Sequence, residues 1–315
     1  MIEYLYLGRL RYDEGLRLQA EVAALRLAGC VDNTLLLLEH PPVLTLGRNA
    51  RRENVLASDE MLARRGVTLH EINRGGDVTY HGPGQLVGYP IFDLRSMVNA
   101  NGGRLGPVDF VRMMEEALIR LCGVYGVRAG RIAGLTGVWC GGDAAGDGGP
   151  IEKSAGKVEG RTSGVECHGN PGAPSARPKS CPDTIGITAS KERKIGAIGI
   201  HVSRGITSHG FAFNVTTDLR DFQLINPCGI TDKPVTSLER EIPEGVSMPG
   251  LEEIAHQAAR QFGQVFAQQV LAVESLDALR AQAAAKPEIA AEDTPLRVPA
   301  EVERLHGDPE RPARA

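Results

Sequence analysis

The sequence predicts an α/β protein, because strand-like and helix-like hydrophobic patterns alternate along its first two thirds. The chain has 315 residues, which is enough for one large domain or two ordinary ones with a sizeable apolar core. Its composition, 42% apolar and 23% charged, is that of an ordinary globular protein. The 38 glycines and 19 prolines predict many turns and some irregular segments.

Short apolar runs that are bounded by turn residues predict the strands. The clearest is a run of four leucines between Asn33 and the prolines at 41 and 42, which is typical of a strand buried on both faces. Pro90 lies within another run and predicts a bulge or an edge strand there. The expected strands are residues 3–7, 34–39, 43–46, 68–72, 86–92, 137–140, 195–202 and 211–215.

Three segments carry apolar residues at helical spacing. Residues 16–27 form the first of them. In the second, Asp109 is expected to cap a helix whose buried face includes Phe110 and Leu118. Residues 251–270 form the third, and they complete the alternating pattern.

Two segments lack the apolar content of the rest. Residues 141–193 contain no Phe, Trp or Tyr and are rich in Gly, Pro and Ser. We expect a flexible surface insertion, because such a segment cannot bury enough apolar surface to offset its loss of conformational entropy. Residues 273–315 also lack aromatic side chains and predict a low-complexity tail that starts helical. The expected organisation is one domain over residues 1–272, containing the insertion, followed by this tail.

Charge and hydropathy exclude several classes of protein. The 35 basic and 39 acidic residues lack the basic excess of a nucleic-acid-binding protein. No apolar run reaches the ~18 residues of a membrane span, and the N-terminus lacks the pattern of a signal peptide. Six cysteines in a chain of this length do not indicate a disulfide framework. These observations predict a cytoplasmic protein that binds neither nucleic acid nor membranes.

The first candidate site is the segment RGGDVTYHGPGQ, residues 74–85. Five of its twelve residues are Gly or Pro, and glycines let a backbone approach a ligand closely. It fits neither the dinucleotide fingerprint nor the phosphate-binding loop with its terminal lysine. A glycine-rich hairpin with a surface arginine is the simpler interpretation of this segment taken alone.

Two further clusters lie near residues 194 and 228. Lys194 begins an apolar, glycine-interrupted strand, where a lysine is usually a solvated residue that protects the strand end. Cys228 lies between a proline and a glycine, and such a turn tends to present its side chain. Many buried cysteines are simply small apolar residues, and Cys30 and Cys122 fit that description better than Cys228 does.

In this order, RGGDVTYHGPGQ, KIGAIGIHVSRGITSHGFAFNV, INPCGI and VTSLERE resemble the motifs of the lipoyl(octanoyl) transferase family, the LipB proteins. The resemblance covers about residues 4–272, and the combination of motifs is specific although each alone is not. It implies the α/β (α+β) fold of biotin and lipoate protein ligases, a mixed sheet flanked by helices. The Gly/Pro-rich insertion occupies the place of a short hairpin in that family.

The resemblance also implies roles for individual residues. Cys228 would be the nucleophile that forms an acyl thioester, and Lys194 would lower its pKa and carry protons. The implied substrate-binding residues lie on the glycine-rich segment and on two strands: Arg74, Gly75, Gly76, Asp77, Val78, Thr79, Tyr80, His81, Ala197, Ile198, Gly199, Gly210, Phe211 and Ala212. No cofactor and no metal are implied, since a thioester donor is already activated.

The implied reaction moves an octanoyl or lipoyl group from acyl carrier protein to a lysine of a lipoyl domain. The implied acceptors are the lipoyl domains of 2-oxoacid dehydrogenase complexes and the glycine cleavage H protein, and the expected state is a monomer. Acyl carrier proteins are acidic, so Arg48, Arg51, Arg52 and Arg74 are candidates for a basic docking patch, although a solvated arginine face explains them equally well. An ATP-dependent lipoate-protein ligase and a non-catalytic lipoyl-domain-binding relative are the alternatives.

Other side chains leave alternatives open. His81 or His209 could serve as the base of a Cys–His hydrolase, although the resemblance assigns His81 to the binding loop and His209 is more typical of a structural histidine. Four side chains in or beside the insertion could hold zinc, but their spacing lacks a C-x-x-C pair and favours unpaired thiols. These are Cys140, Cys167, His168 and Cys181.

Overall fold

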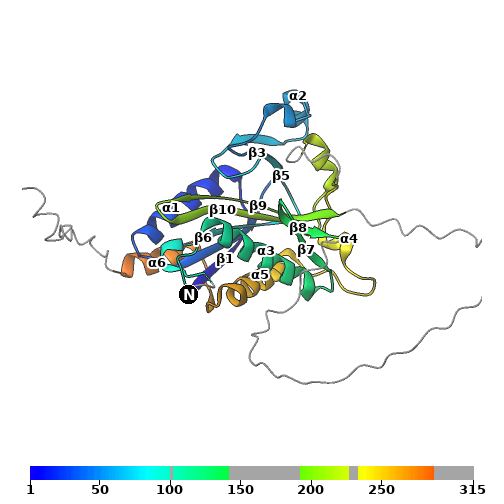
Figure 1. Cartoon of the computed structure of the whole chain (residues 1–315). Helices are drawn as coiled ribbons and strands as arrows, with labels where there is room; N and C mark the ends of the chain where they lie inside the picture. Colours follow the sequence, from blue (N-terminus) through cyan, green and yellow to red (C-terminus); the bar gives the residue numbers. More distant parts are fainter. Residues whose placement is uncertain (100–101, 142–191, 227–232, 287–315) are drawn as a thin grey trace, which may run out of the picture.

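The computed structural model describes residues 1–99, 102–141, 192–226 and 233–286. The chain forms an eight-stranded sheet and a three-stranded sheet, with helices against both faces of the larger one (Figure 1). The eight strands follow the order β11-β1-β2-β6-β10-β9-β8-β7. Strand β1 runs parallel to β2 and β11, and the other neighbours are antiparallel. The expected mixed sheet is therefore confirmed.

The bounds of the elements are as follows. The large sheet contains β1 (Ile2–Arg9), β2 (Asn33–Glu39), β6 (Gln85–Ile91), β7 (Ala129–Ile132), β8 (Leu135–Cys140), β9 (Arg193–Ser203), β10 (Ile206–Asn214) and β11 (Val270–Ala272). The small sheet contains β3 (Val43–Leu46), β4 (Thr68–Glu71) and β5 (Val78–His81). The helices are α1 (Tyr12–Leu27), α2 (Asp59–Arg64), α3 (Pro107–Val124), α4 (Leu238–Glu241), α5 (Leu251–Phe266) and α6 (Leu276–Ala285).

The four leucines of β2 explain why the sheet is covered on both faces. Successive side chains of a strand point to opposite faces. Leu35 and Leu37 belong to the core beneath α3 and α5, whereas Leu36 and Leu38 belong to the core beneath α1 and α6. All four are fully buried. Both faces of the strand therefore need apolar side chains, whereas an alternating pattern would place polar side chains in one of the two cores.

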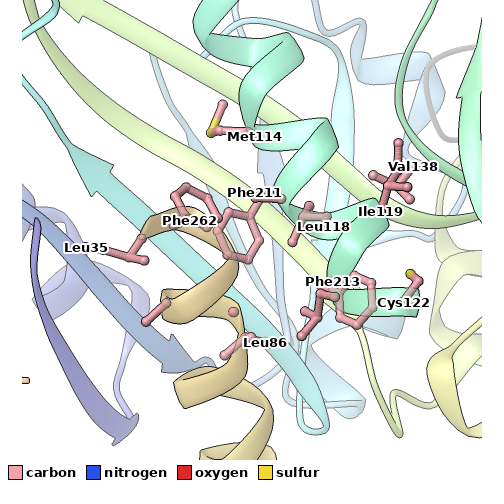
Figure 2. Packing of buried hydrophobic residues seen from close by; sticks show 14 of the residues in the cluster. Leu35, Leu86, Met114, Leu118, Ile119, Cys122, Val138, Phe211, Phe213 and Phe262 are labelled. Carbon is pink, nitrogen blue, oxygen red and sulfur yellow. The ribbon is translucent and has the colours of Figure 1, made fainter. Parts of the chain in front are cut away.

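Aromatic rings fill the core between the sheet and helices α3 and α5. Phe211 of β10 stacks on Phe262 of α5 with 5.5 Å between ring centroids. Figure 2 shows these two rings side by side, with Met114 and Leu118 of α3 nearby. This core packs against the face of β9 and β10 that is opposite α1. Both strands carry predicted site residues.

Helix α3 begins earlier than expected, and its predicted cap is wrong. Gly106 is the N-cap residue and Pro107 occupies the first turn. Proline suits that position because its missing N–H is one that a helix start cannot satisfy internally, and its φ is already helical. Asp109 therefore lies inside the first turn, where a carboxylate interacts favourably with the helix dipole.

The segment expected as a tail starts helical, as predicted, and this helix packs against the core. Helix α5, expected to extend to residue 270, ends at Phe266, because Ala267 adopts a left-handed conformation with φ 51°. The chain then enters β11. Helix α6 follows, and Leu279 packs at 1% exposure in the core shared with α1. Residues 142–191, which contain most of the predicted insertion, and residues 287–315 lie outside the described part. Within that part, no helix is both long and apolar enough to cross a membrane.

Candidate active site

A cavity of about 830 Å³, open mouth included, lies where the glycine-rich segment meets strands β9 and β10. Apart from Gly75 and Tyr80, every predicted substrate-binding residue lines it. Lys194 lines it too. We call this cavity the central pocket. Residues separated by more than a hundred positions in the sequence thus meet at one hollow of the fold.

The glycine-rich segment closely approaches β9. The Gly75 N–H donates to the Ile200 carbonyl at 2.9 Å. A Cβ added at Gly199 would lie 2.7 Å from the Gly75 carbonyl oxygen, which no ordinary contact allows. Glycine at position 199 is therefore required by the contact between the segment and the strand. Gly75 itself lines a neighbouring hollow rather than the central pocket.

Arg74 fastens the segment to the small sheet. Its guanidinium donates to the Thr45 carbonyl at 2.8 Å, to the Thr45 hydroxyl at 3.0 Å and to the Gly75 carbonyl at 3.0 Å. The residue is only 8% exposed, although it also contributes to the pocket lining. Arg74 therefore does not belong to an exposed basic patch, whereas Arg48, Arg51 and Arg52 are exposed.

Tyr80 points away from the central pocket. Its hydroxyl donates to the Asp221 carboxylate at 2.8 Å, and its ring packs edge-on against Phe222. The residue is 1% exposed within the core of the small sheet. Burial and the Asp221 carboxylate raise the pKa of Tyr80 well above its usual value. Its role in the described structure is to join β5 to the segment that precedes residue 227.

His81 lies at the floor of the pocket as a neutral imidazole. Burial lowers its pKa to about 3. Its Nδ1 lies 2.8 Å from Gln85 Oε1, while Gln85 Nε2 donates to the Tyr80 carbonyl and to Asn214 Oδ1. Because the Gln85 nitrogen is used by two acceptors, its oxygen faces the histidine, and we assign the imidazole proton to Nδ1.

That hydrogen-bond network continues to the strand that carries Lys194. Asn214 Nδ2 donates to the Thr236 carbonyl at 2.9 Å. The Thr236 N–H donates to the Lys194 carbonyl at 2.9 Å, and the Lys194 N–H donates to the Pro234 carbonyl at 2.9 Å. The backbone of Lys194 is thus held by residues 234–236, which Asn214 in turn holds. Asn214 ends the motif GFAFN, and sequence reasoning gave it no role.

His209 is fixed on the opposite wall. Its N–H donates to Gln19 Oε1 at 2.7 Å, and its ring Nε2 lies 2.7 Å from Asn73 Oδ1. Burial lowers its pKa to about 4, so it is neutral at physiological pH. These contacts, together with a φ of 56°, are typical of a structural histidine that shapes the wall.

Sequence reasoning missed several residues of the pocket, of which Tyr12 and Tyr89 are the most buried aromatic ones. Tyr12 of α1 stacks on the His81 ring with 6.1 Å between centroids. The Tyr89 hydroxyl contacts His40 Nε2 at 2.6 Å. Tyr89 could have been found from its alternation with Val87 on one strand face. Tyr12 precedes the expected helix and carries no local signal.

Lys194 lies at the junction of two hollows. The second, which we call the side groove, is lined by Asn49, Val111, Thr136 and Ile200 among others. Both hollows share Lys194, Gly76, Asp77, Ile198 and Gly199. The Nζ atom of Lys194 lies over the Trp139 ring, 5.0 Å from its centroid. Lys194, to which the resemblance assigns a catalytic role, is half-exposed and forms part of the pocket wall. It is not the fully solvated residue that its position at a strand end, taken alone, would suggest.

Cys228 falls in residues 227–232, outside the described part of the chain. The residues on either side are placed: the Asn226 N–H donates to the Asn54 carbonyl at 2.7 Å, and Lys233 forms an ion pair with Glu192. Val235, two residues further on, lines the central pocket.

Of the four side chains considered for zinc, only Cys140 is described. It is 1% exposed, and burial raises the pKa of its thiol to about 12. Among the described residues, no group of three or more His, Cys, Asp or Glu side chains is placed to hold a metal ion.

Comparison with known proteins identifies the family. Residues 11–262 match the lipoyl protein ligase A/B catalytic domain. The chain is 53% identical over 276 residues to an octanoyltransferase of Acidobacterium capsulatum, covering 87% of this chain and 94% of that one. It is 44% identical over 308 residues to an octanoyltransferase of Koribacter versatilis, covering 98% of both.

A solved structure supports the same fold. The bipartite lipoate protein ligase of Thermoplasma acidophilum superimposes with a TM-score of 0.56 at 15% identity, covering 90% of this chain and 91% of that one. At this identity the likeness concerns the fold alone, and it confirms the expected ligase-like architecture. With the match to the catalytic domain and the close relatives, it follows that this chain belongs to the lipoyl protein ligase A/B catalytic domain family, the family of these octanoyltransferases.

Proposed function

We propose that this protein is an octanoyltransferase, which transfers an octanoyl or lipoyl group from acyl carrier protein to a lysine of lipoyl domains through a thioester on Cys228. The observation that carries this proposal is the 53% identity to an octanoyltransferase over nearly the whole of both chains. The central pocket supplies a place for the chemistry, because Lys194 and the glycine-rich segment form its walls.

The lining of the pocket suits a short fatty chain. Apolar residues of four strands line it, among them Val78, Val87, Ile198 and Phe211. Small residues at Gly196, Ala197 and Ala212 leave the space between them. Each buried CH₂ of an acyl chain contributes about 0.8 kcal/mol, so a slot of this kind distinguishes chain lengths.

We propose that the Lys194 ammonium ionises the Cys228 thiol by lowering its pKa. A cysteine thiol ordinarily has a pKa of ~8.5 and is only a few per cent ionised at neutral pH. An ammonium within ~4 to 6 Å favours the thiolate, and a depression of ~2 pKa units would make it the major form. The thiolate is required because it is the nucleophilic form of cysteine.

The proton balance of the reaction assigns Lys194 a second task. The thiolate attacks the donor thioester, and the carrier thiolate leaves and takes a proton from the Lys194 ammonium. The amine of the acceptor lysine then attacks the enzyme thioester, the C–S bond breaks, and neutral Lys194 accepts the proton from the amine. The Cys228 thiolate and the Lys194 ammonium are thereby restored, and no nucleotide is consumed.

His81 and His209, the two histidines considered as a base, are poorly suited to that proton transfer. The pKa values of His81 and His209 are lowered to about 3 and about 4 by burial. A general base works best when its pKa lies near the operating pH. Both rings are also engaged, His81 with Gln85 and His209 with Asn73. This favours the lysine over the histidine base of a Cys–His hydrolase.

The partners follow from the same proposal. Lipoyl domains of 2-oxoacid dehydrogenase complexes and the glycine cleavage H protein are the proposed acceptors, and the protein is proposed to act as a cytoplasmic monomer. Exposed Arg48, Arg51 and Arg52 lie on the chain just before and within the turn that leads to α2. They are proposed to attract the acidic carrier protein. Residues 1–272 are proposed as the catalytic domain, with residues 141–193 as an insertion in it.

Intact-protein mass spectrometry tests this function. The protein is incubated with octanoyl acyl carrier protein without nucleotide, and a lipoyl domain is then added. We expect the mass of one octanoyl group on the wild type, its absence on Cys228→Ser, and its passage to the acceptor. A strict requirement for ATP would instead identify a lipoate-protein ligase. Binding of the lipoyl domain without any acyl adduct would identify a non-catalytic relative.

A further inference from the structure

The indole ring of Trp139 is in contact with the side chain of Lys194. The Lys194 Nζ atom lies over the indole ring, 5.0 Å from its centroid. An ammonium within ~6 Å of an indole face is attracted by the ring quadrupole, more strongly where water is excluded. Trp139 is 1% exposed, so the ring is a fixed and desolvated surface.

The chain next to Trp139 leaves room for the lysine stem. Gly137 has a φ of 125°, and a Cβ placed there would lie 2.6 Å from Lys194 Cε and 2.5 Å from the Gly196 carbonyl oxygen. The Gly137 N–H donates at 2.9 Å to Glu115, a fully buried carboxylate on α3. Helix α3 thus fixes β8 at the point where the lysine crosses it.

We propose that Trp139 is a positioning residue, whose indole face holds the Lys194 ammonium at the junction of the central pocket and the side groove and favours its charged form. The proposal rests on the proposed function, since it explains how the lysine that we propose as the activator of Cys228 is kept cationic. Nothing in the motif pattern of the sequence assigned Trp139 a role.

Several charged groups near Lys194 form ion pairs of their own, whereas the Asp77 carboxylate, which lines both hollows, accepts from neutral donors. The Glu115 carboxylate accepts from Arg112 and Arg131, Arg193 pairs with Glu241, and Lys233 pairs with Glu192. Asp77 accepts from Asn54 and from the Val78 N–H, and Arg74 donates to Thr45. The Cys140 thiol on β8 remains neutral, because burial raises its pKa to about 12. The indole face adds its attraction for the ammonium to this charged environment.

The chain offers a direct spectroscopic test, because Trp139 is its only tryptophan. The tryptophan fluorescence of the wild type, Lys194→Met and Lys194→Arg is recorded from about pH 7 to about pH 11, a range that includes the ordinary lysine pKa of ~10.4. We expect Lys194→Met to shift the tryptophan emission at neutral pH, because the ammonium is gone from the ring face. We also expect it to remove the step in the alkaline pH curve that deprotonation of Lys194 causes, whereas any step caused by tyrosine ionisation should appear in all three proteins. Arginine should keep the neutral-pH emission without that step. Identical pH traces in wild type and Lys194→Met would overturn the proposal.

A kinetic arm distinguishes positioning from a structural role. In Trp139→Phe and Trp139→Leu, the alkaline limb of kcat/KM should move to lower pH, by about 0.5 to 1 pH unit for leucine and less for phenylalanine. A uniform loss of rate with an unmoved limb would show a merely structural ring. If the wild type transfers no octanoyl group, the proposed function fails while the fluorescence still decides the ring–ammonium contact. Normal transfer without the fluorescence difference overturns only the positioning role.

Discussion

The side chain of Asn214 links the floor of the central pocket to the backbone around Lys194, and its removal is a sharp test of that link. Asn214→Ala removes the donor to the Thr236 carbonyl and the acceptor of Gln85 Nε2, each at 2.9 Å. A buried group left without a partner costs roughly 1–3 kcal/mol. Gln85 keeps the Tyr80 carbonyl as an acceptor, so its share is smaller. We expect a total loss of roughly 2–4 kcal/mol in the free energy of unfolding.

The expected functional effect is larger than this loss of stability explains. Without Asn214, residues 234–236 and the Lys194 backbone that is bonded to them lose their anchor to β10. A resulting misplacement of about 1 Å would cost on the order of 100-fold in rate. Single-turnover transfer of the octanoyl group, measured well below the unfolding midpoint, isolates this effect from unfolding. Asn214→Asp keeps the acceptor for Gln85 but not the donor for Thr236, and it should fail similarly.

Asn33→Ala is the matched control for Asn214→Ala. Asn33 is also a buried asparagine at one end of a central strand, and its Oδ1 accepts from the Asp93 N–H at 2.9 Å and from Arg26 Nε at 3.0 Å. It does not line the central pocket. We expect a comparable loss of stability with nearly normal transfer. Equal loss of transfer in both variants, or normal transfer in Asn214→Ala, would refute the positioning argument.

Three other predictions use groups described above. Ala197→Leu should fill part of the pocket and lower the ratio of octanoyl to butanoyl transfer roughly tenfold or more, and an unchanged ratio would place the acyl chain elsewhere. The pKa values of His40, His81 and His209 are lowered by burial to about 4, 3 and 4, so the unfolded chain binds more protons between those values and ~6.5. Stability should therefore fall as pH falls through this window, by about 2 kcal/mol for each histidine at pH 5, measured by urea unfolding; a flat profile would contradict the burial. Cys140, whose pKa is about 12, should resist thiol reagents at pH 8 in the folded protein, and peptide mapping that finds it modified would show local opening.

The strands of the large sheet were largely predictable because their side chains are buried in a regular way. In the large sheet, β2 differs from expectation by one residue, and in the small sheet β3 (Val43–Leu46) has the expected bounds. Such runs carry their own signal, since burial on both faces demands continuous apolar residues. The short strands β5, β7 and β11 were missed, because none of them has three large apolar side chains as β3 does.

Pro90 shows how tertiary context changes a local rule. The edge strand that it predicts is wrong, because β6 lies between β2 and β10. The ladder from β6 to β10 extends only from Gln85 to Gly88, so Pro90 lies beyond its end. The proline therefore needs no N–H on that side, which its sequence alone could not reveal.

The site was predictable where a motif carried it and not where packing alone did. The motif residues that face the pocket do so because β5, β9 and β10 meet there, and the motifs lie on those strands. Tyr80 departs from them because its ring packs in the core of the small sheet and its hydroxyl donates to Asp221. Tyr12 and Trp139 enter the site from α1 and β8, through contacts that only the folded chain creates.

The pairing of β1 with β11 places the first and last described strands side by side, with the Ile2 N–H donating to the Gln269 carbonyl. Three strands, β2, β6 and β10, separate β1 from β9, which carries Lys194. At the end of α6, the Lys286 Nζ atom lies 3.4 Å from the Asp32 carboxylate, next to Asn33, which pairs with Ile2. A short peptide could therefore join residues 2 and 286 away from the strand that carries Lys194. This makes the fold a natural subject for circular permutation, with new ends opened in an exposed connection such as the turn after α2.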